Sequence, residues 1–222
     1  TCIPELSRAL VSVNSSIVVT EPIPKVLQQI GWSGEESLTD SQMMVNYYRT
    51  TKDGRIAFGK ETGSISYGTE IGPLFSDDSD CIDLTERNFR STYPHLNEVK
   101  TVKSWSGPID RTYDSLPIFG QLTGHNNIHY GVGWSGNGVG PSQIGGRILA
   151  SLALGKVDQW SQCALVNRGF KKFPSDPIRY LGAKLIRQAV IKKEQAEMAG
   201  QKPSWINVWL SSHAPSGLED KA

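Results

Sequence analysis

The chain has 222 residues, of which 38% are hydrophobic and 20% charged, and its formal net charge is +1. These values are typical of a globular protein with a substantial core, and they give no electrostatic reason to expect nucleic acid or a membrane as a partner. No apolar run reaches the roughly 18 residues of a membrane span, and no basic segment followed by an apolar one opens the chain, so we expect a cytoplasmic protein. The three cysteines lack CxxC spacing, which indicates neither a disulfide framework nor a metal site.

The first quarter of the chain is typical of β-sheet. Residues 16–20, SIVVT, form a β-branched run that stops at the segment EPIP, as expected of a strand leaving a sheet. Residues 43–51 and 55–60 predict two more strands, joined across Asp53-Gly54, which is a strong hairpin signal.

A two-residue turn at Asp53-Gly54 would fix the pairing of this hairpin. Tyr48 would then lie opposite Gly59, and Arg49 opposite Phe58. One face would carry Val45, Tyr47, Ile56 and Phe58, and the other Asn46, Tyr48 and Ala57. Neither face is purely apolar, so we expect the core on one side of the sheet and a ligand or second domain on the other.

A short helix and a structured loop are expected next. Asp83 and Glu86 resemble a capping box, which opens a helix that must end by Tyr93, before Pro94. Residues 103–122, KSWSGPIDRTYDSLPIFGQL, are rich in proline, glycine and other turn formers, and they predict a loop rather than a strand or helix.

The segment GVGWSGNGVGPSQIGGRILASLALG, residues 131–155, organises the rest of the chain. It predicts a strand over 128–132, a glycine-rich loop, and a helix from Pro141 that ends at Gly155. The first turn of a helix has free N–H groups and the positive end of the helix dipole. Glycines in the preceding loop let the backbone approach a ligand closely. The loop is therefore expected to bind an anionic or electron-rich group.

A long helix is expected near the C-terminus. It begins at Asp176-Pro177 and ends before Gly200. Its apolar stripe, which we expect to face the core, consists of Ile178, Leu181, Leu185 and Val190. Its other face carries Arg179, Lys184, Arg187, Lys192 and Lys193. We interpret this basic face as a solvated surface rather than a docking site for an acidic partner, because the whole chain is near neutral.

The spacing of Gly131, Gly133 and Gly136 matches GxGxxG, the fingerprint of a dinucleotide-binding turn. That fingerprint requires an acidic residue at the end of a following strand, about 20 residues on. Asp158 lies at that distance, but only Val157 precedes it where a hydrophobic strand is needed. The helix also begins too late, at Pro141, so the sequence does not favour this interpretation.

Two blocks of residues resemble the C-terminal part of a known enzyme family. The first block, W-G-G followed by D-x-T-x-D-x-L-P-x-x-G in the family, is matched by Trp105, Gly107, Asp110, Thr112, Asp114, Leu116, Pro117 and Gly120. The second, G-[YFW]-S-G-H-G-V, is matched by Trp134, Ser135, Gly136, Gly138 and Val139. With both blocks in order, residues 1–156 resemble FAD-dependent oxidoreductases of the D-amino-acid oxidase type, which include glycine, sarcosine and γ-glutamylputrescine oxidases.

This resemblance implies that FAD is the cofactor and that a small amine or amino acid is the substrate, oxidised to an imine. The cofactor-binding residues it implies, around the pyrimidine end of the flavin ring, are Trp134, Ser135, Gly136, Asn137, Gly138, Val139 and Gly140. The substrate pocket is expected to include Tyr48, Arg49 and Trp105.

The chain departs from the family pattern at the positions that anchor a substrate carboxylate. Asn137 stands where histidine is common, and Gly140 stands where sarcosine-oxidising members have lysine. The arginine of glycine-oxidising members is replaced by the stretch that contains Trp105. A carboxylate anchor would have to come from Arg49 or Arg111.

Members of that family begin with a Rossmann half, which holds the rest of FAD. No segment of this sequence resembles that half. We therefore expect an α+β fold in which residues 1–125 form a substrate-binding sheet domain, 126–156 a flavin-capping strand, loop and helix, and 157–222 a helical extension with a tail.

One hypothesis is that the chain is the C-terminal part of an oxidoreductase, inactive without its N-terminal half. The alternative is a non-catalytic binding module, truncated in evolution, that forms a homodimer through the former flavin face, with Trp105 and Trp134 in the interface.

Overall fold

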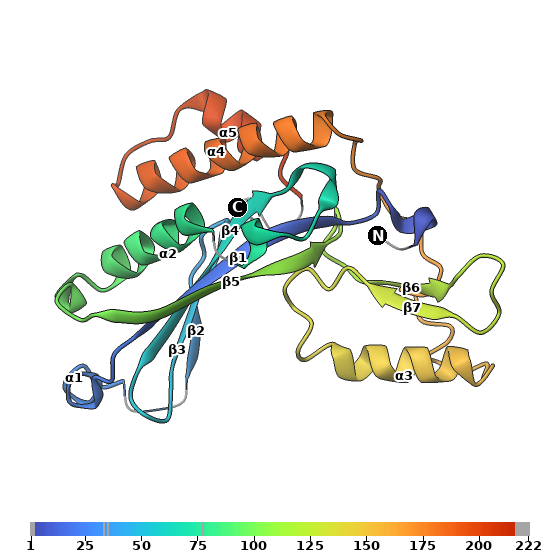
Figure 1. Cartoon of the computed structure of the whole chain (residues 1–222), viewed down its shortest axis with the longest axis horizontal. Helices are drawn as coiled ribbons and strands as arrows, with labels where there is room; N and C mark the ends of the chain where they lie inside the picture. Colours follow the sequence, from blue (N-terminus) through green and yellow to red (C-terminus); the bar gives the residue numbers. More distant parts are fainter. Residues whose placement is uncertain (1–2, 33, 35, 77, 216–222) are drawn as a thin grey trace.

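A five-stranded sheet forms the centre of the molecule, with every neighbouring pair antiparallel and the strands in the order β2-β3-β4-β1-β5 (Figure 1). The computed structural model describes residues 3–32, 34, 36–76 and 78–215. The strands are β1 (Val11–Thr20), β2 (Ser37–Thr39), β3 (Asn46–Thr50), β4 (Ile56–Ile65), β5 (Thr101–Arg111), β6 (Ile118–Gln121) and β7 (His129–Val132). The helices are α1 (Pro24–Gln29), α2 (Ser79–Thr92), α3 (Ser142–Ala153), α4 (Ile178–Met198) and α5 (Trp205–Ser211), with short 3-10 turns at Pro4–Leu6, Tyr67–Thr69, Pro73–Phe75 and Pro94–Leu96. This arrangement confirms the predicted α+β class, an antiparallel sheet with flanking helices.

The β3–β4 hairpin has a longer loop than its sequence suggests. The Thr51 N–H donates to the Arg55 carbonyl, and Gly54 adopts a φ of +75°, which glycine tolerates without strain. The loop therefore comprises residues 52–54, and the pairing is shifted by one residue from the expected one. Tyr48 lies opposite Phe58, and Arg49 lies opposite Ala57, so the predicted pairs were wrong.

The shifted register decides which tyrosine faces the core. Tyr48 stacks on Phe58 with ring centroids 5.1 Å apart, on the face of the sheet that α2 covers. Phe89 of α2 joins the same hydrophobic cluster. Tyr47 lies on the opposite face, across from Gly59. We call this opposite face the open face; by strand register and alternation it also carries Ser15, Ile17, Glu61, Trp105, Gly107 and Ile109.

The segment expected to be a loop, residues 103–122, instead contains β6 and most of β5, so that prediction was wrong. β5 lies at the edge of the sheet and pairs with β1. Pro108 has no N–H to give to a ladder, and an edge strand tolerates this because one side of its backbone needs no strand partner. The prolines and glycines that suggested a loop are therefore compatible with this strand.

A second, two-stranded sheet pairs β6 with β7, and α3 packs against it (Figure 1). The predicted strand and helix in this segment are confirmed, with Ile148 of α3 fully buried and Gly155 at a φ of +62° just beyond the helix end. β6 precedes the predicted domain boundary at 125/126, whereas β7 follows it. Phe119 of β6 also exchanges backbone hydrogen bonds with Leu165 and Asn167, so the C-terminal segment extends this small sheet.

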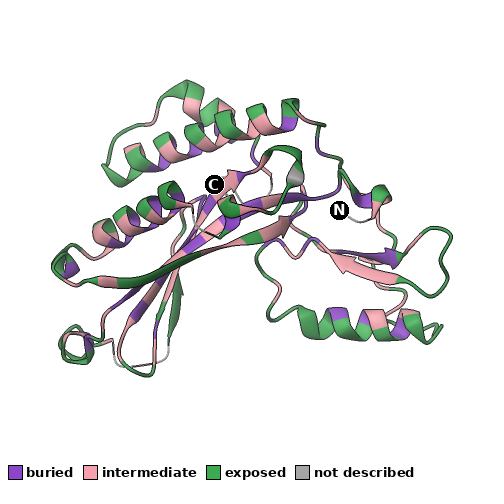
Figure 2. Ribbon diagram, in the orientation of Figure 1, coloured by how far each residue is buried: buried purple, intermediate pink, exposed green. Residues whose placement is uncertain are grey.

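The long C-terminal helix has the expected limits, but its buried side differs from the predicted one, although Lys184 and Lys192 are exposed as expected. Ile178, Leu181 and Leu185 are 67%, 57% and 62% exposed, whereas Arg179 and Lys193 are buried, so the predicted stripe was wrong except at Val190. Much of the surface of α4 is exposed (Figure 2). One cause is a buried ion pair between Glu194 of α4 and Lys60 of β4, which turns Glu194 and Lys193 inward beside the buried Ala189 and Val190. Among the described residues, no helix combines the length and apolarity required to cross a membrane.

The start of α2 also differs from the prediction. The helix begins at Ser79, and its N-cap is Asp78, whose side chain accepts a hydrogen bond from the Cys81 N–H. The capping box expected at Asp83 therefore lies inside the helix. The predicted end before Pro94 is confirmed, and residues 216–222 of the expected C-terminal tail lie outside the described residues.

Candidate functional site

One aspartate at the end of β5 holds the start of the glycine-rich loop. The Asp110 carboxylate accepts hydrogen bonds from the N–H groups of Gly133 at 2.6 Å and Trp134 at 3.1 Å. The Asp110 carbonyl accepts a third, from the Ser135 N–H. These three bonds join the small sheet to the large one and fix the direction in which the loop leaves β7.

Trp134 and Ser135 form the base of the loop. The Trp134 ring lies edge-on to Phe119, and it fills the space in which a side chain at Gly145 of α3 would have to sit. Ser135 is buried in a left-handed conformation, with a φ of +52°, and its hydroxyl lies within hydrogen-bond distance of the Thr112 N–H and the Gly133 carbonyl. Both side chains point into the protein and anchor the loop.

The rest of the loop, residues 136–140, is presented to the exterior. Within the described part of the chain, the N–H groups of Gly136, Gly138, Val139 and Gly140 have no hydrogen-bond acceptor. The Val139 side chain is 95% exposed. α3 begins directly after the loop, without a side-chain cap and without an acidic residue in its first turn. The loop and helix therefore offer unused donors and a positive dipole end at one place.

The open face of the large sheet lies directly against this loop. A Cβ atom at Gly136 would lie 3.3 Å from Ile109 Cδ1 and 3.4 Å from Glu61 Oε1, and the φ of Gly136 is +85°. Glycine is therefore needed here both for its backbone conformation and for the close approach to β4 and β5. A ligand bound to the exposed side of the loop would therefore lie beside the open face.

The charged group nearest the loop on this face is Glu61. Its Oε2 atom lies 3.4 Å from Nη1 of Arg111, which is 2% exposed. Burial raises the pKa of the Glu61 carboxyl, and the positive charges of Arg111 and Lys60 oppose that rise. Beside it, the hydroxyls of Tyr47 and Ser15 lie 2.7 Å apart, and burial also raises the pKa of Tyr47.

Two of the three predicted substrate residues, Tyr48 and Arg49, line one small cavity of about 180 Å³ on the open face, and Trp105 lies next to a third lining residue. Tyr48 and Arg49 are among the lining residues, but the Tyr48 ring packs into the core behind the sheet. Trp105 is directly opposite Ile17, which also lines the cavity, and it is 45% exposed. Sequence reasoning missed Tyr47 as a site residue because of the register error, and it missed Glu61 because no motif marks it.

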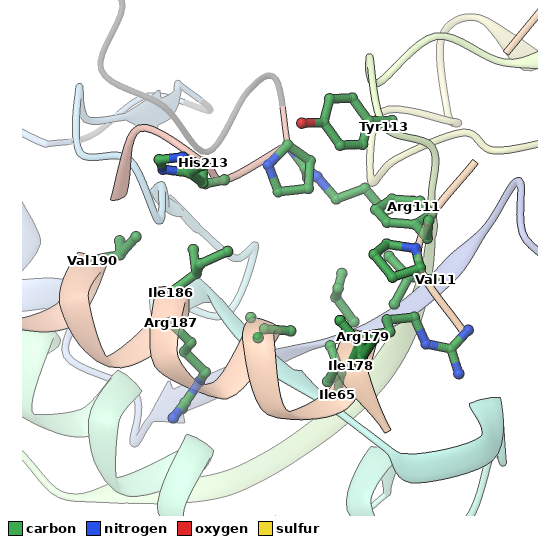
Figure 3. Close-up of a pocket in the computed structure, with 18 of the residues that line it drawn as sticks. Val11, Ile65, Arg111, Tyr113, Ile178, Arg179, Ile186, Arg187, Val190 and His213 are labelled. Atoms are coloured by element: carbon green, nitrogen blue, oxygen red, sulfur yellow. The ribbon is translucent and has the colours of Figure 1, made fainter. Parts of the chain in front are cut away.

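A second cavity, of about 370 Å³, lies between α4 and the sheet (Figure 3). Its walls are mainly apolar, with Val11 and Ile65 on the strands facing Ile186 and Val190 on α4. Arg111 lines this cavity as well, and its guanidinium reaches Glu61 on the open face, so the two regions meet at that arginine.

The acidic residue of the possible dinucleotide fingerprint has a local role. The Asp158 carboxylate accepts hydrogen bonds from the Ser151 hydroxyl and from the N–H groups of Trp160 and Ser161. β7 pairs with β6 in the antiparallel sense, so residues 128–158 do not form the parallel strand-helix-strand unit that a dinucleotide turn requires.

Comparison with known proteins identifies relatives of most of the chain. The model of the DAO family, described as FAD dependent oxidoreductase, matches residues 3–152. A probable oxidoreductase OrdL from Haemophilus influenzae is 30% identical over 156 residues, which is 70% of this chain and 33% of that protein. The gamma-glutamylputrescine oxidoreductase of Escherichia coli is 29% identical over 171 residues, covering 77% of this chain and 37% of that protein. The chain thus spans about a third of the length of these relatives.

Solved structures share the fold over a similar region. Glycine oxidase from Geobacillus kaustophilus matches with a TM-score of 0.54 and 19% identity, covering 74% of this chain and 41% of that one. Fructosyl amine:oxygen oxidoreductase from Aspergillus fumigatus matches with a TM-score of 0.58 and 14% identity, covering 73% and 39%. At these identities the likeness shows the fold alone.

Proposed function

Since this chain belongs to the family of FAD-dependent oxidoreductases of the D-amino-acid oxidase type, we propose that it forms the substrate and flavin-ring portion of an enzyme that oxidises an amine or amino acid to an imine. The observation that carries this proposal is the exposed loop 136–140, which has unused N–H groups and begins next to Glu61 and Ile109 of the open face. The flavin would lie along the loop, and the substrate would lie between the flavin and the open face.

The donor set of the loop suits the electron-rich edge of a flavin ring. FAD, when bound, supplies the acceptor for the hydride removed from the substrate. The N–H groups of Gly136, Gly138, Val139 and Gly140 would hydrogen-bond the ring, and the first turn of α3 would stabilise negative charge there. Trp134, Ser135 and Asn137 would support these contacts, the first two by fixing the loop from beneath. Donors held in place before the reaction stabilise developing charge without reorganisation.

The remainder of the cofactor needs a binding surface that these residues do not provide, so we propose that an N-terminal FAD-binding half completes the site. The proposal is supported by the length of the relatives, of which this chain matches about a third. It is also supported by exposed apolar side chains beside the loop, with Val139 at 95% and Ile144 at 50% exposure. Such apolar neighbours are expected where another part of the protein docks. The chain alone would then be inactive.

The alternative, a non-catalytic module that dimerises through the same face, would bury these side chains as well. An experiment that combines the chain with its N-terminal half and records flavin absorbance distinguishes the two hypotheses. We expect yellow protein that is bleached anaerobically by an amine or amino acid. Colourless protein that light scattering shows to be a dimer, with Trp105 protected from solvent, would instead support the alternative.

A further inference from the structure

We propose that Glu61 is a specificity-determining residue that binds the protonated amino group of the substrate, so that the preferred substrates are amines without a carboxylate on the amino-bearing carbon. This inference rests on the function proposed above and specifies its substrate class. It is carried by the geometry of one carboxylate, the arginine beside it and the space in front of it.

The two oxygens of Glu61 face in different directions. Oε2 lies 3.4 Å from Nη1 of Arg111. Oε1 is on the loop side, 3.4 Å from the position that a Cβ of Gly136 would occupy. The side chain is 18% exposed, so it is largely desolvated yet accessible from the open face. A negative charge therefore lies where the loop and the sheet meet, the place assigned above to the reacting end of the substrate.

The same geometry disfavours a substrate carboxylate at this position. An α-amino acid needs a cation beside its carboxylate, and Arg111 and Arg49 were the candidates. Arg111 is buried and is paired with Glu61, which offsets its charge at the loop. The Arg49 side chain bonds to the Thr50 carbonyl on β3, and Arg49 pairs with Ala57, four residues along β4 from Glu61. The Glu61 side chain is 18% exposed and that of Arg111 only 3%, so a ligand at the loop would meet the carboxylate before the guanidinium. An incoming carboxylate would then meet a like charge, and an ammonium group an opposite one.

The open face also has room for an amine beside Glu61. Glu61 pairs with Ser15, and Ser15 pairs in turn with Gly107. A Cβ atom at Gly107 would have no atom within 4 Å, so the surface in front of Gly107, beside Ser15 of the neighbouring strand, is free. The paired hydroxyls of Tyr47 and Ser15 border this space and supply further hydrogen-bond acceptors for an ammonium group. The cavity of about 180 Å³ next to Tyr47 would accept the rest of the molecule.

The test uses two ligands that cannot be oxidised, because neither has a hydrogen on the amino-bearing carbon. These are tert-butylamine and 2-aminoisobutyrate, which differ in a methyl group against a carboxylate. The protein used is the chain joined to its N-terminal half and loaded with flavin. Calorimetry measures how tightly it binds each of the two ligands. We expect the amine to bind at least about tenfold more tightly, the size of effect expected when one buried charge pair replaces one like-charge contact. Equal affinities, or tighter binding of 2-aminoisobutyrate, would overturn the proposal without use of any variant.

The variant Glu61→Gln extends the test to the residue itself. Glu61→Gln should weaken binding of tert-butylamine by about tenfold or more. The control Glu98→Gln changes an exposed carboxylate on a distant turn and should leave that binding unchanged. Unchanged affinity in Glu61→Gln would mean that Glu61 only pairs with Arg111. If Glu61→Gln does not retain flavin, Glu61→Asp, which keeps the charge, should still prefer the amine. A wild-type protein that retains no flavin would refute the proposed function instead, and visible absorbance recorded before each titration distinguishes the two failures.

Discussion

Replacing Asp110 by asparagine should loosen the loop that the proposed flavin site depends on. The aspartate carboxylate accepts two backbone hydrogen bonds, from Gly133 at 2.6 Å and from Trp134 at 3.1 Å. Asparagine has the same shape, but one of its two terminal atoms is an NH₂ group, which is a donor. One of the two N–H groups would then face another donor, and the remaining bond would lose its charge.

The expected cost follows from these contacts. A hydrogen bond to a charged group contributes about 1.5–3 kcal/mol, and a buried donor left without an acceptor costs about 1–3 kcal/mol. Gly133 is buried, so water cannot replace the lost acceptor easily. Allowing for partial rearrangement of the loop, we expect Asp110→Asn to lower the free energy of unfolding by about 2–3 kcal/mol.

Equilibrium unfolding in urea, followed by tryptophan fluorescence, measures this change. The matched control is Asp83→Asn, since Asp83 is exposed on α2, and a surface change of this kind should alter the free energy of unfolding by less than about 0.5 kcal/mol. If Asp110→Asn is as stable as Asp83→Asn, then Asp110 does not hold the loop, and the account of how the site is positioned is wrong.

Two further predictions concern the protein away from the loop. Glu194→Gln should lower the free energy of unfolding by about 3–5 kcal/mol, because it leaves the Lys60 ammonium, which is 1% exposed, without its counter-charge. Urea unfolding measures this change, and a loss below about 1 kcal/mol would show that the pair is not buried as described. Burial raises the pKa of the Cys81 thiol to about 11, so at pH 8 it is almost entirely protonated and the reactive thiolate is scarce. Iodoacetamide at pH 8 should therefore label the half-buried Cys163 much faster than Cys81 in the folded protein, and equal labelling rates by peptide mass spectrometry would contradict this.

The sequence predicted the elements whose signals are local. The strand, loop and helix around residues 131–155 were expected from glycines and periodicity, and the structure confirms them. The hairpin was also expected, but its register depended on whether Lys52 belongs to the loop, and a change of one residue exchanged Tyr47 and Tyr48 between the two faces. A single-residue ambiguity in a turn therefore decided which tyrosine could belong to the site.

Features that depend on tertiary neighbours could not be predicted in the same way. The prolines and glycines of β5 suggested a loop, because nothing local says that this segment pairs as an edge strand with β1. The stripe of α4 was assigned to the wrong side because Glu194 meets Lys60 across more than a hundred residues of sequence. Glu61 approaches Gly136 only after the two sheets are placed together, and no spacing between them could have indicated it.

Hydrogen–deuterium exchange of residues 136–140 tests whether this loop binds the flavin. In the completed protein without FAD, the amides of Gly136, Gly138, Val139 and Gly140 should exchange rapidly, since they have no acceptor among the described residues. Adding FAD should slow their exchange, while the β3–β4 hairpin loop at residues 52–54, at the end of the large sheet away from α3, stays unchanged (Figure 1). If FAD binds and the exchange of residues 136–140 does not change, the loop does not contact the flavin.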